Sequence, residues 1–228
     1  MFAMLPGVAH TLVNPGFFVD NYLRLLPMAV HLRILPDLYG DGECAPPSNE
    51  DIARVVVACL ADPTAHDGTV YRPTGPALLS PTDIHAIFER LTGSRIFRLA
   101  LPQWVAIKAM MLDGADAFQI ADLFDFVEDN KRGAFAVRGV TNDVQRLTGV
   151  PAESFETTAR RYLVLPQNYP SFSNKLKTFL KFAVTPLARG MNISRYRAAM
   201  QIPMHPTPVL SVDSATWRRE HTFPQPST

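Results

Sequence analysis

The sequence lacks several features that would place it at once in a familiar class of protein. It has only 2 cysteines, Cys44 and Cys59, too few for a disulfide framework, and they do not form a Cys-x-x-Cys pair. No apolar stretch approaches the roughly 20 residues of a membrane-spanning helix, so we expect no integral membrane association. No basic segment and small-residue cleavage site mark a secretory signal. Together these absences predict a protein of the reducing cytoplasm.

The sequence also has little excess charge of either sign. Its 22 Lys and Arg residues oppose 21 Asp and Glu residues, and a net charge of +1 gives no reason to expect a nucleic-acid partner. The charge is unevenly placed, however. Residues 1–159 hold 12 basic and 19 acidic side chains (−7), whereas residues 160–228 hold 10 and 2 (+8). A basic last third predicts a segment that docks on its own domain, on a partner or on an anionic surface.

Residue patterns typical of metal and nucleophilic chemistry are absent as well. The 6 histidines show no metal-ligand spacing, so no metal site is predicted. No Ser-His-Asp or Cys-His arrangement can be argued, and the catalytic residues therefore stay unknown at this stage.

Strands alternating with helices nevertheless follow from turn residues and apolar spacing. A strand is expected at residues 10–14, where Pro15-Gly16 ends it. Ser48 and Asp51 form an N-terminal capping pattern, and an apolar stripe at helical spacing follows at Ile52, Val55, Val56, Cys59 and Leu60. Residues 36–47 are rich in turn formers and predict a loop with at most one short strand. The remaining predicted segments are strands 69–72 and 95–101 and helices 80–92, 102–112, 116–128, 141–149 and 153–163.

Composition changes after residue 165. We therefore expect two parts, residues 1–165 and a basic helical extension with a proline-rich tail over residues 166–228. A polar linker is predicted at 167–174, helices at 175–184 and 191–200, and an extended tail from Pro203. Lys175, Lys177 and Lys181 alternate with Leu and Phe residues. This short amphipathic patch would either touch an anionic membrane surface or pack on the acidic body.

Four stretches, taken in order and spacing, carry a family resemblance. They are LPGVAHTLVNPGFFVDNYL (5–23), NEDIARVVVACLADPTAHDGTVY (49–71), TGPALLSPTDIHAIFERLTGSRI (74–96) and TNDVQRLTGVPAESFETTARRY (141–162). They resemble the NmrA-like family of atypical short-chain dehydrogenases. The resemblance implies an α/β fold: the C-terminal portion of a Rossmann-like domain, with few parallel strands plus helices, a small mostly helical substrate subdomain and an extended tail. It also implies NADP or NAD as the cofactor.

Two motifs that such a protein would use are missing from the 228 residues. No GxGxxG or GxxGxxG sequence offers a backbone cradle for the dinucleotide pyrophosphate. The Tyr-x-x-x-Lys pair, which transfers protons in ordinary short-chain dehydrogenases, is absent too. We therefore expect either a fragment of a longer protein or a natural half-domain completed by a partner. Strand 10–14 would then be an exposed edge through which the chain forms oligomers.

The resemblance implies that Asn14, Pro15, Gly16, Phe17 and Phe18 are cofactor-binding residues. They follow a strand at its carboxyl end, and strand ends of this kind face the ligand crevice in open α/β sheets. The alternative for this run is a tight turn followed by two core phenylalanines.

The expected substrate-pocket residues are Asn21, Tyr39 and Trp104. Each has a structural alternative: Asn21 as a helix cap, Tyr39 as a half-buried loop residue, and Trp104 as plain core together with Met110, Met111 and Phe118. Asp51 matches a recurrent acidic position of the family, and its alternative is helix capping.

These observations predict an NmrA-like NAD(P)-binding protein with an oxidoreductase-type fold that lacks its dinucleotide-binding half. Its partner would be a small-molecule substrate. The alternative is a non-catalytic protein that senses the NAD(P) redox state and signals to a regulatory protein partner, or an interaction module.

Overall fold

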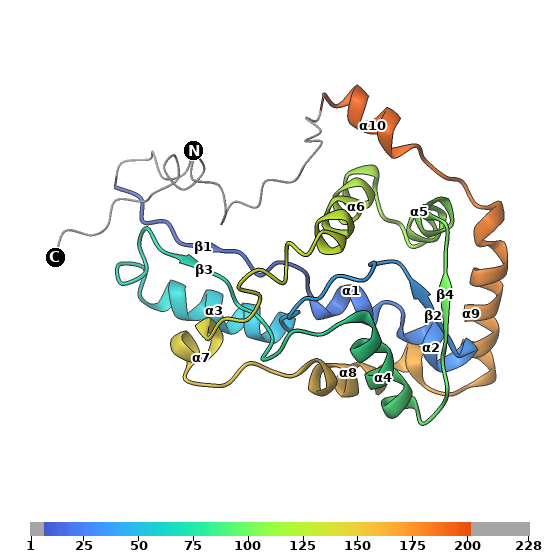
Figure 1. The fold of residues 1–228 in the computed structure, drawn as a ribbon, viewed down its shortest axis with the longest axis horizontal. Helices are drawn as coiled ribbons and strands as arrows, with labels where there is room; N and C mark the ends of the chain where they lie inside the picture. Colours follow the sequence, from blue (N-terminus) through green and yellow to red (C-terminus); the bar gives the residue numbers. More distant parts are fainter. Residues whose placement is uncertain (1–6, 202–228) are drawn as a thin grey trace.

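The computed structural model describes residues 7–201, in which helices predominate and the strands are short (Figure 1). The elements in chain order are β1 (Leu12–Val13), α1 (Val19–Leu23), α2 (Leu26–Leu32), β2 (Ile34–Asp37), α3 (Asn49–Ala61), β3 (Val70–Tyr71), α4 (Pro81–Thr92), β4 (Phe97–Ala100), α5 (Gln103–Leu112), α6 (Ala117–Lys131), α7 (Asp143–Thr148), α8 (Phe155–Leu163), η2 (Pro166–Asn168), α9 (Phe172–Val184), η3 (Thr185–Leu187) and α10 (Ile193–Ala199). The α/β class with few parallel strands is confirmed. The tail predicted from Pro203 lies outside the described residues.

The strands form two separate parallel pairs. β1 pairs with β3, Leu12 opposite Val70, and the Asn14 amide donates to the Tyr71 carbonyl at 2.8 Å. β2 pairs with β4, beginning with Ile34 opposite Phe97. Both pairings join segments far apart in sequence, and in each the intervening chain crosses over through helices, as parallel pairing requires.

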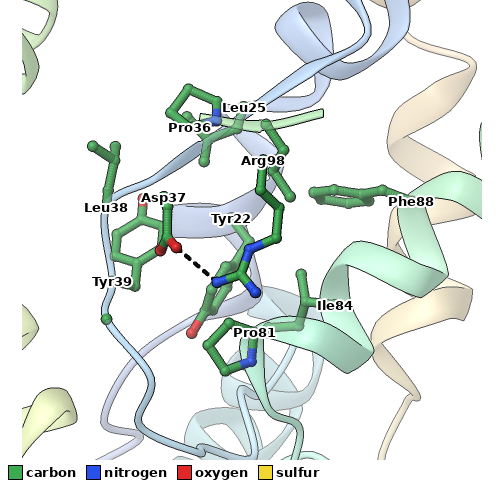
Figure 2. A pocket seen from close by; sticks show the side chains of 12 residues that line it. Tyr22, Leu25, Pro36, Asp37, Leu38, Tyr39, Pro81, Ile84, Phe88 and Arg98 are labelled. Atoms are coloured by element: carbon green, nitrogen blue, oxygen red, sulfur yellow. Dashed lines mark hydrogen bonds and ion pairs between the residues drawn. The ribbon is translucent and has the colours of Figure 1, made fainter. Parts of the chain in front are cut away.

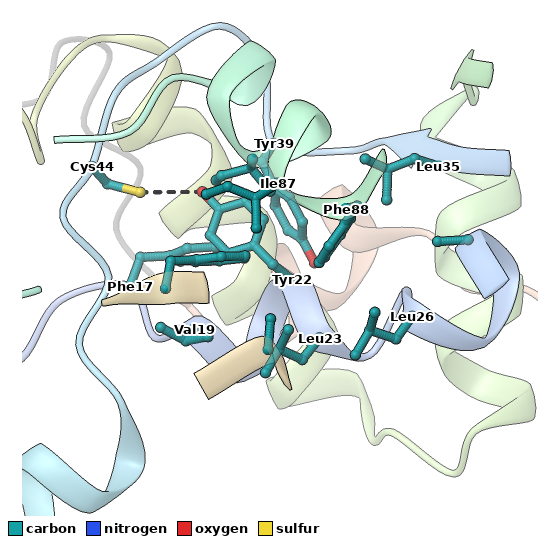
Figure 3. Packing of buried hydrophobic residues seen from close by; sticks show 14 of the residues in the cluster. Phe17, Val19, Tyr22, Leu23, Leu26, Leu35, Tyr39, Cys44, Ile87 and Phe88 are labelled. Carbon is teal, nitrogen blue, oxygen red and sulfur yellow. Dashed lines mark hydrogen bonds between the residues drawn. The ribbon is translucent and has the colours of Figure 1, made fainter. Parts of the chain in front are cut away.

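The main hydrophobic core lies between α1, α2, α4 and α8 (Figure 3). α4 shows how the sequence builds it: Ser80 and Asp83 form a reciprocal capping box, and Gly93 ends the helix at φ 61°. The helix buries Ile84, Ile87 and Phe88 on one face. The helix bounds match the helix predicted at 80–92.

α3 begins at its predicted Ser48 cap but buries only part of its predicted apolar stripe. Val55 and Cys59 pack with Tyr71 and Val144 in a second core cluster. Val56 and Leu60 are 37% and 70% exposed, so these two residues of the stripe are not covered by described elements. Described elements cover only one side of this helix.

The loop predicted at 36–47 begins after Asp37, because β2 extends to that residue. α2 and β2 together occupy residues 26–37. Pro27 lies in the first turn of α2, where a missing backbone donor costs nothing. The helix ends at Arg33 in the left-handed conformation, φ 56°. Glycine usually marks such an end, so the sequence carried no stop signal there.

The basic extension packs along one side of the molecule (Figure 1). α9 lies beside α2, η3 beside α5, and α10 beside α6. The predicted linker is partly ordered, since η2 contains Asn168, whose side chain donates to the Tyr162 carbonyl at 2.8 Å. A domain boundary near residue 165 stays a prediction. Within residues 7–201, no helix combines the length and apolarity needed to cross a membrane.

Candidate functional site

The run from Asn14 to Phe18 follows the carboxyl end of β1. Asn14 is held there by its backbone bond to β3, and its side chain is exposed. Gly16 has φ 67°, and a Cβ at this position would lie 3.4 Å from the Phe135 ring. A left-handed backbone close to an aromatic ring favours glycine at Gly16. Asn14 and Gly16 thus form an accessible corner where the sheet ends.

The two phenylalanines of this run have other surroundings. Phe17 is 4% exposed, and its ring meets those of Tyr22 and Tyr39 edge-on at centroid distances of 5.3 and 5.0 Å (Figure 3). Phe18 is the extended residue that precedes α1. For Phe17 the structure therefore shows core packing, and the ring connects the corner to the pocket described next.

A pocket lies beside these tyrosines, between α1, α4 and the segment that follows β2 (Figure 2). The space between its walls, counted together with open solvent at its mouth, is about 360 Å³, and the part that a water molecule can enter is about 30 Å³. Its walls include Tyr22, Asp37, Tyr39, Ile84, Phe88 and Arg98. Arg98 donates to Asp37 Oδ2 at 2.7 Å and places one guanidinium among aromatic and aliphatic walls. Apolar walls with a few polar groups are the usual lining of a ligand pocket.

Both pocket tyrosines have their hydroxyl groups engaged with the protein. Tyr39 donates to the Asn21 carbonyl at 2.6 Å, and the Tyr22 hydroxyl lies 3.1 Å from Cys44 Sγ. Burial raises the pKa of both tyrosines above the ordinary range for a phenol. They stay neutral near pH 7 and present ring faces and edges, not phenolates. Asn21 enters this arrangement through its backbone carbonyl.

Trp104 lies away from this pocket. It is 52% exposed on α5, and Lys108 Nζ lies 5.2 Å from the centre of its ring. Met110 and Met111 are partly buried in a separate cluster around Ile107, and Phe118 is 62% exposed. The structure thus brings Tyr39 to the pocket and places Trp104 elsewhere.

Asn130 is a pocket-supporting residue that the sequence did not reveal. It is 1% exposed at the end of α6, and its side chain donates to the carbonyls of Tyr39 and Gly42 at 2.9 and 3.4 Å. It therefore fixes the segment that carries Tyr39. Asn130 stands among charged residues beyond the helix predicted at 116–128, and its partners lie 91 and 88 residues away, so no local pattern marked it.

Arg72 plays a similar part at the corner. Its guanidinium donates to the carbonyls of Phe135 and Val137 at 3.2 and 3.0 Å, which holds the segment after α6 above Gly16. Burial lowers the pKa of Arg72. Phe135 also stacks on Phe126 at 5.9 Å. The residue types of this loop gave no sequence indication of that arrangement.

Asp51 has a structural role. Its amide donates to Ser48 Oγ at 3.0 Å, and its fully buried carboxylate pairs with Arg54 and accepts from the Glu153 amide at 2.8 Å. These contacts join the start of α3 to the segment before α8. They account for an acidic residue here without any chemistry on a substrate.

The described residues at the end of β1 could meet only one end of a dinucleotide. Asn14 is exposed there, whereas Gly16 is half-buried beside the Phe135 ring. The pyrophosphate end has no counterpart, because the sequence has no glycine loop. The helix after β1 has only 5 residues and begins at Phe18 without a side-chain cap. Among residues 7–201 no group of His, Cys, Asp and Glu could hold a metal ion.

Comparison with known proteins gives related enzymes but no matching family model. The chain is 31% identical to the NAD(P)H azoreductase of Xenophilus azovorans over 163 residues, covering 68% of the chain and 54% of that protein. It is 25% identical to quinone oxidoreductase 2 of Escherichia coli over 119 residues, 51% of the chain and 41% of that protein. The chain thus spans about half the length of these relatives.

A solved structure shows the same fold. The NADPH-dependent quinone oxidoreductase of Escherichia coli, complexed with NADPH, superposes with a TM-score of 0.57 at 21% identity. The match covers 68% of this chain and 54% of that one. The described residues therefore adopt part of the Rossmann-like fold of an NADPH-dependent oxidoreductase.

Proposed function

We propose that this chain supplies the substrate-side half of an NmrA-like, NAD(P)-dependent oxidoreductase. The observation that carries the proposal is the aromatic-walled pocket after β2, joined through Phe17 to the corner at Asn14 and Gly16. Pockets at the carboxyl ends of parallel strands are the usual ligand sites of this fold class. The relationship to an azoreductase and a quinone oxidoreductase supports the same role.

The proposed substrates are planar aromatic electron acceptors of the quinone or azo class. Tyr22 and Tyr39 line the pocket with 5% and 7% of their surface exposed, and Arg98 offers hydrogen-bond donors for a carbonyl oxygen. The chain's own residues would bind and orient the acceptor and shield it from water. The proposed nicotinamide cofactor, NADP or NAD, would supply the hydride from a dinucleotide site that these 228 residues do not contain. Asn14 to Phe18 would border the nicotinamide.

A nuclear magnetic resonance titration of the chain with a soluble naphthoquinone tests the substrate assignment. Saturable shifts are expected at the amides of Leu38, Tyr39, Gly40 and Arg98. A Tyr39→Leu variant should bind about threefold to tenfold more weakly, because an aromatic contact contributes about 0.5–1.5 kcal/mol.

Tyr169→Leu is the matched control, since Tyr169 is 57% exposed and does not line the pocket. It should bind as the unaltered chain does. Shifts confined to other surfaces, or equal weakening in both variants, would remove the basis for an acceptor site here. They would favour the non-catalytic alternative, a redox-sensing regulator with a protein partner.

A further inference from the structure

Helix α9 packs on the protein through a largely polar side and leaves its apolar side exposed. None of its 13 residues is buried, and it runs along the outer edge of the molecule beside α2 (Figure 1). The side turned toward the body carries Asn174, Thr178 and Phe182, which are half-buried. Asn174 donates to the carbonyls of Pro166 and Tyr169 at 2.8 and 3.0 Å. The anchored side of this helix is therefore largely polar.

Its apolar side faces outward. The exposed fractions are 81% at Phe172, 43% at Leu176, 53% at Phe179, 51% at Leu180 and 46% at Val184. Residues spaced three and four apart share one side of a helix, so these side chains form a continuous exposed stripe. We call it the α9 stripe. Exposed apolar patches of this kind mark surfaces that meet a partner or a membrane.

Basic side chains flank the α9 stripe. At about 100° per residue, Lys175 and Lys177 fall on its opposite borders. Both are exposed, and neither forms a salt bridge with a described residue. Lys181 points to the body and pairs with Asp113. Residues 160–201 contain 8 Lys and Arg and no Asp or Glu. Four of these cations pair with carboxylates of the body, and Lys175, Lys177, Arg189 and Arg195 form no salt bridge with a described residue.

We propose that the α9 stripe binds an anionic lipid surface, with its phenylalanines and leucines at the boundary of the acyl chains and Lys175 and Lys177 at the headgroups. An apolar helix face bordered by lysines is the pattern of helices that lie in the membrane interface. The inference does not depend on the proposed oxidoreductase role.

Charge and geometry favour lipid over a second copy of the chain. Two α9 stripes facing each other would bring the unpaired Lys175 and Lys177 of both copies together, which costs energy at short range. Docking of the stripe on the acidic body of another copy would be a head-to-tail contact, which leads to open filaments unless it closes into a ring. A stripe on an outermost helix can meet a flat surface without either problem.

Co-sedimentation with vesicles tests this proposal. The purified chain should bind vesicles of phosphatidylcholine mixed with phosphatidylglycerol, and much less to phosphatidylcholine alone. Lys175→Gln and Lys177→Gln should each weaken binding about fivefold. Raising the salt from 0.1 M to 1 M shortens the screening length from about 10 Å to about 3 Å and should release the chain.

Phe179→Ser should weaken binding at least about tenfold, through loss of buried apolar area. Leu60→Ser is the matched control, because Leu60 is 70% exposed on α3, outside the stripe. Circular dichroism checks that both variants fold. Equal binding to both vesicle types, no binding, or equal effects of the two serine variants would overturn the proposal. Self-association in lipid-free solution that Phe179→Ser abolishes would instead assign the stripe to a second copy.

Discussion

Gly42 lies so close to α6 that it tolerates no side chain. A Cβ there would lie 1.7 Å from the backbone oxygen of Asn130. We expect Gly42→Ala to lower the free energy of unfolding by about 3 kcal/mol, the upper end for overpacking, because backbone cannot move aside as a side chain can. Gly190→Ala is the control, since its Cβ meets only the flexible Lys108 side chain at 3.3 Å. Equal denaturant midpoints for the two variants would contradict this packing.

The free energy of unfolding depends on pH through the ionisation of Glu153. Two hydrogen bonds of 2.9 Å from Arg161 hold the pKa of Glu153 at about 2, below its ordinary value of about 4.3. A lowered carboxyl pKa adds stability above the unfolded value, and this is lost as the pH falls from about 4.5 toward 2. Because Arg161 is 40% exposed, we expect at most about 1 kcal/mol.

The pair is tested by unfolding curves across that pH range. The unaltered chain should have a higher free energy of unfolding than Glu153→Gln, and this difference should disappear as the pH falls from 4.5 to 2. Arg161→Gln also removes the pair between Arg161 and Glu50, so the double variant should lose less than the sum of the two single losses, and the difference measures the coupling of Glu153 and Arg161. A difference in unfolding free energy that is constant with pH would show that the ion pair does not set the pKa of the Glu153 carboxyl.

Between elements, the side chain of Asn130 joins α6 to the segment that carries Tyr39. Asn130→Leu keeps the shape of the side chain but leaves the Tyr39 carbonyl without that donor. We expect a loss of about 1–3 kcal/mol in unfolding free energy, the cost of an unmade buried hydrogen bond. Asn142→Leu is the control, because Asn142 is exposed and makes no capping bond. Equal stability of both variants would contradict the role of Asn130.

The β1–β3 pair and α3 leave apolar side chains exposed on neighbouring elements. Leu12 is 49% exposed, Val70 43% and Val57 64%. We expect the chain to self-associate with rising concentration in light scattering, as short strands with exposed edges do. Leu12→Lys should reduce association, and Val164→Lys, at a 64% exposed site elsewhere, should not. A monomer at all concentrations would contradict the prediction made from strand 10–14.

Local residue chemistry accounts for what could be predicted from the sequence. Helices α3 and α4 begin at Ser48 and Ser80, because a capping side chain meets the third residue of its own helix. Tyr39 was expected to line a substrate pocket, and it lines the pocket beside α4. Arg98 and Asn130, which complete the site, contact it from 61 and 91 residues away, and no local pattern encodes such contacts. The end of α2 at Arg33 was missed for a local reason, because arginine is unusual at a left-handed helix end, where glycine is the common residue.

For the molecule as a whole, we propose that the described residues provide an acceptor pocket and a corner for the nicotinamide end. The sequence has no glycine loop for the pyrophosphate. Most of a dinucleotide's anchoring in this fold comes from that loop and the helix after it. The purified chain should therefore hold the substrate without holding the cofactor.

Calorimetric titration of the purified 228-residue chain with NADPH tests this claim most directly. The account predicts no saturable heat at micromolar concentrations of NADPH. Micromolar binding by the chain alone would contradict it, because a complete dinucleotide site would then exist within these residues.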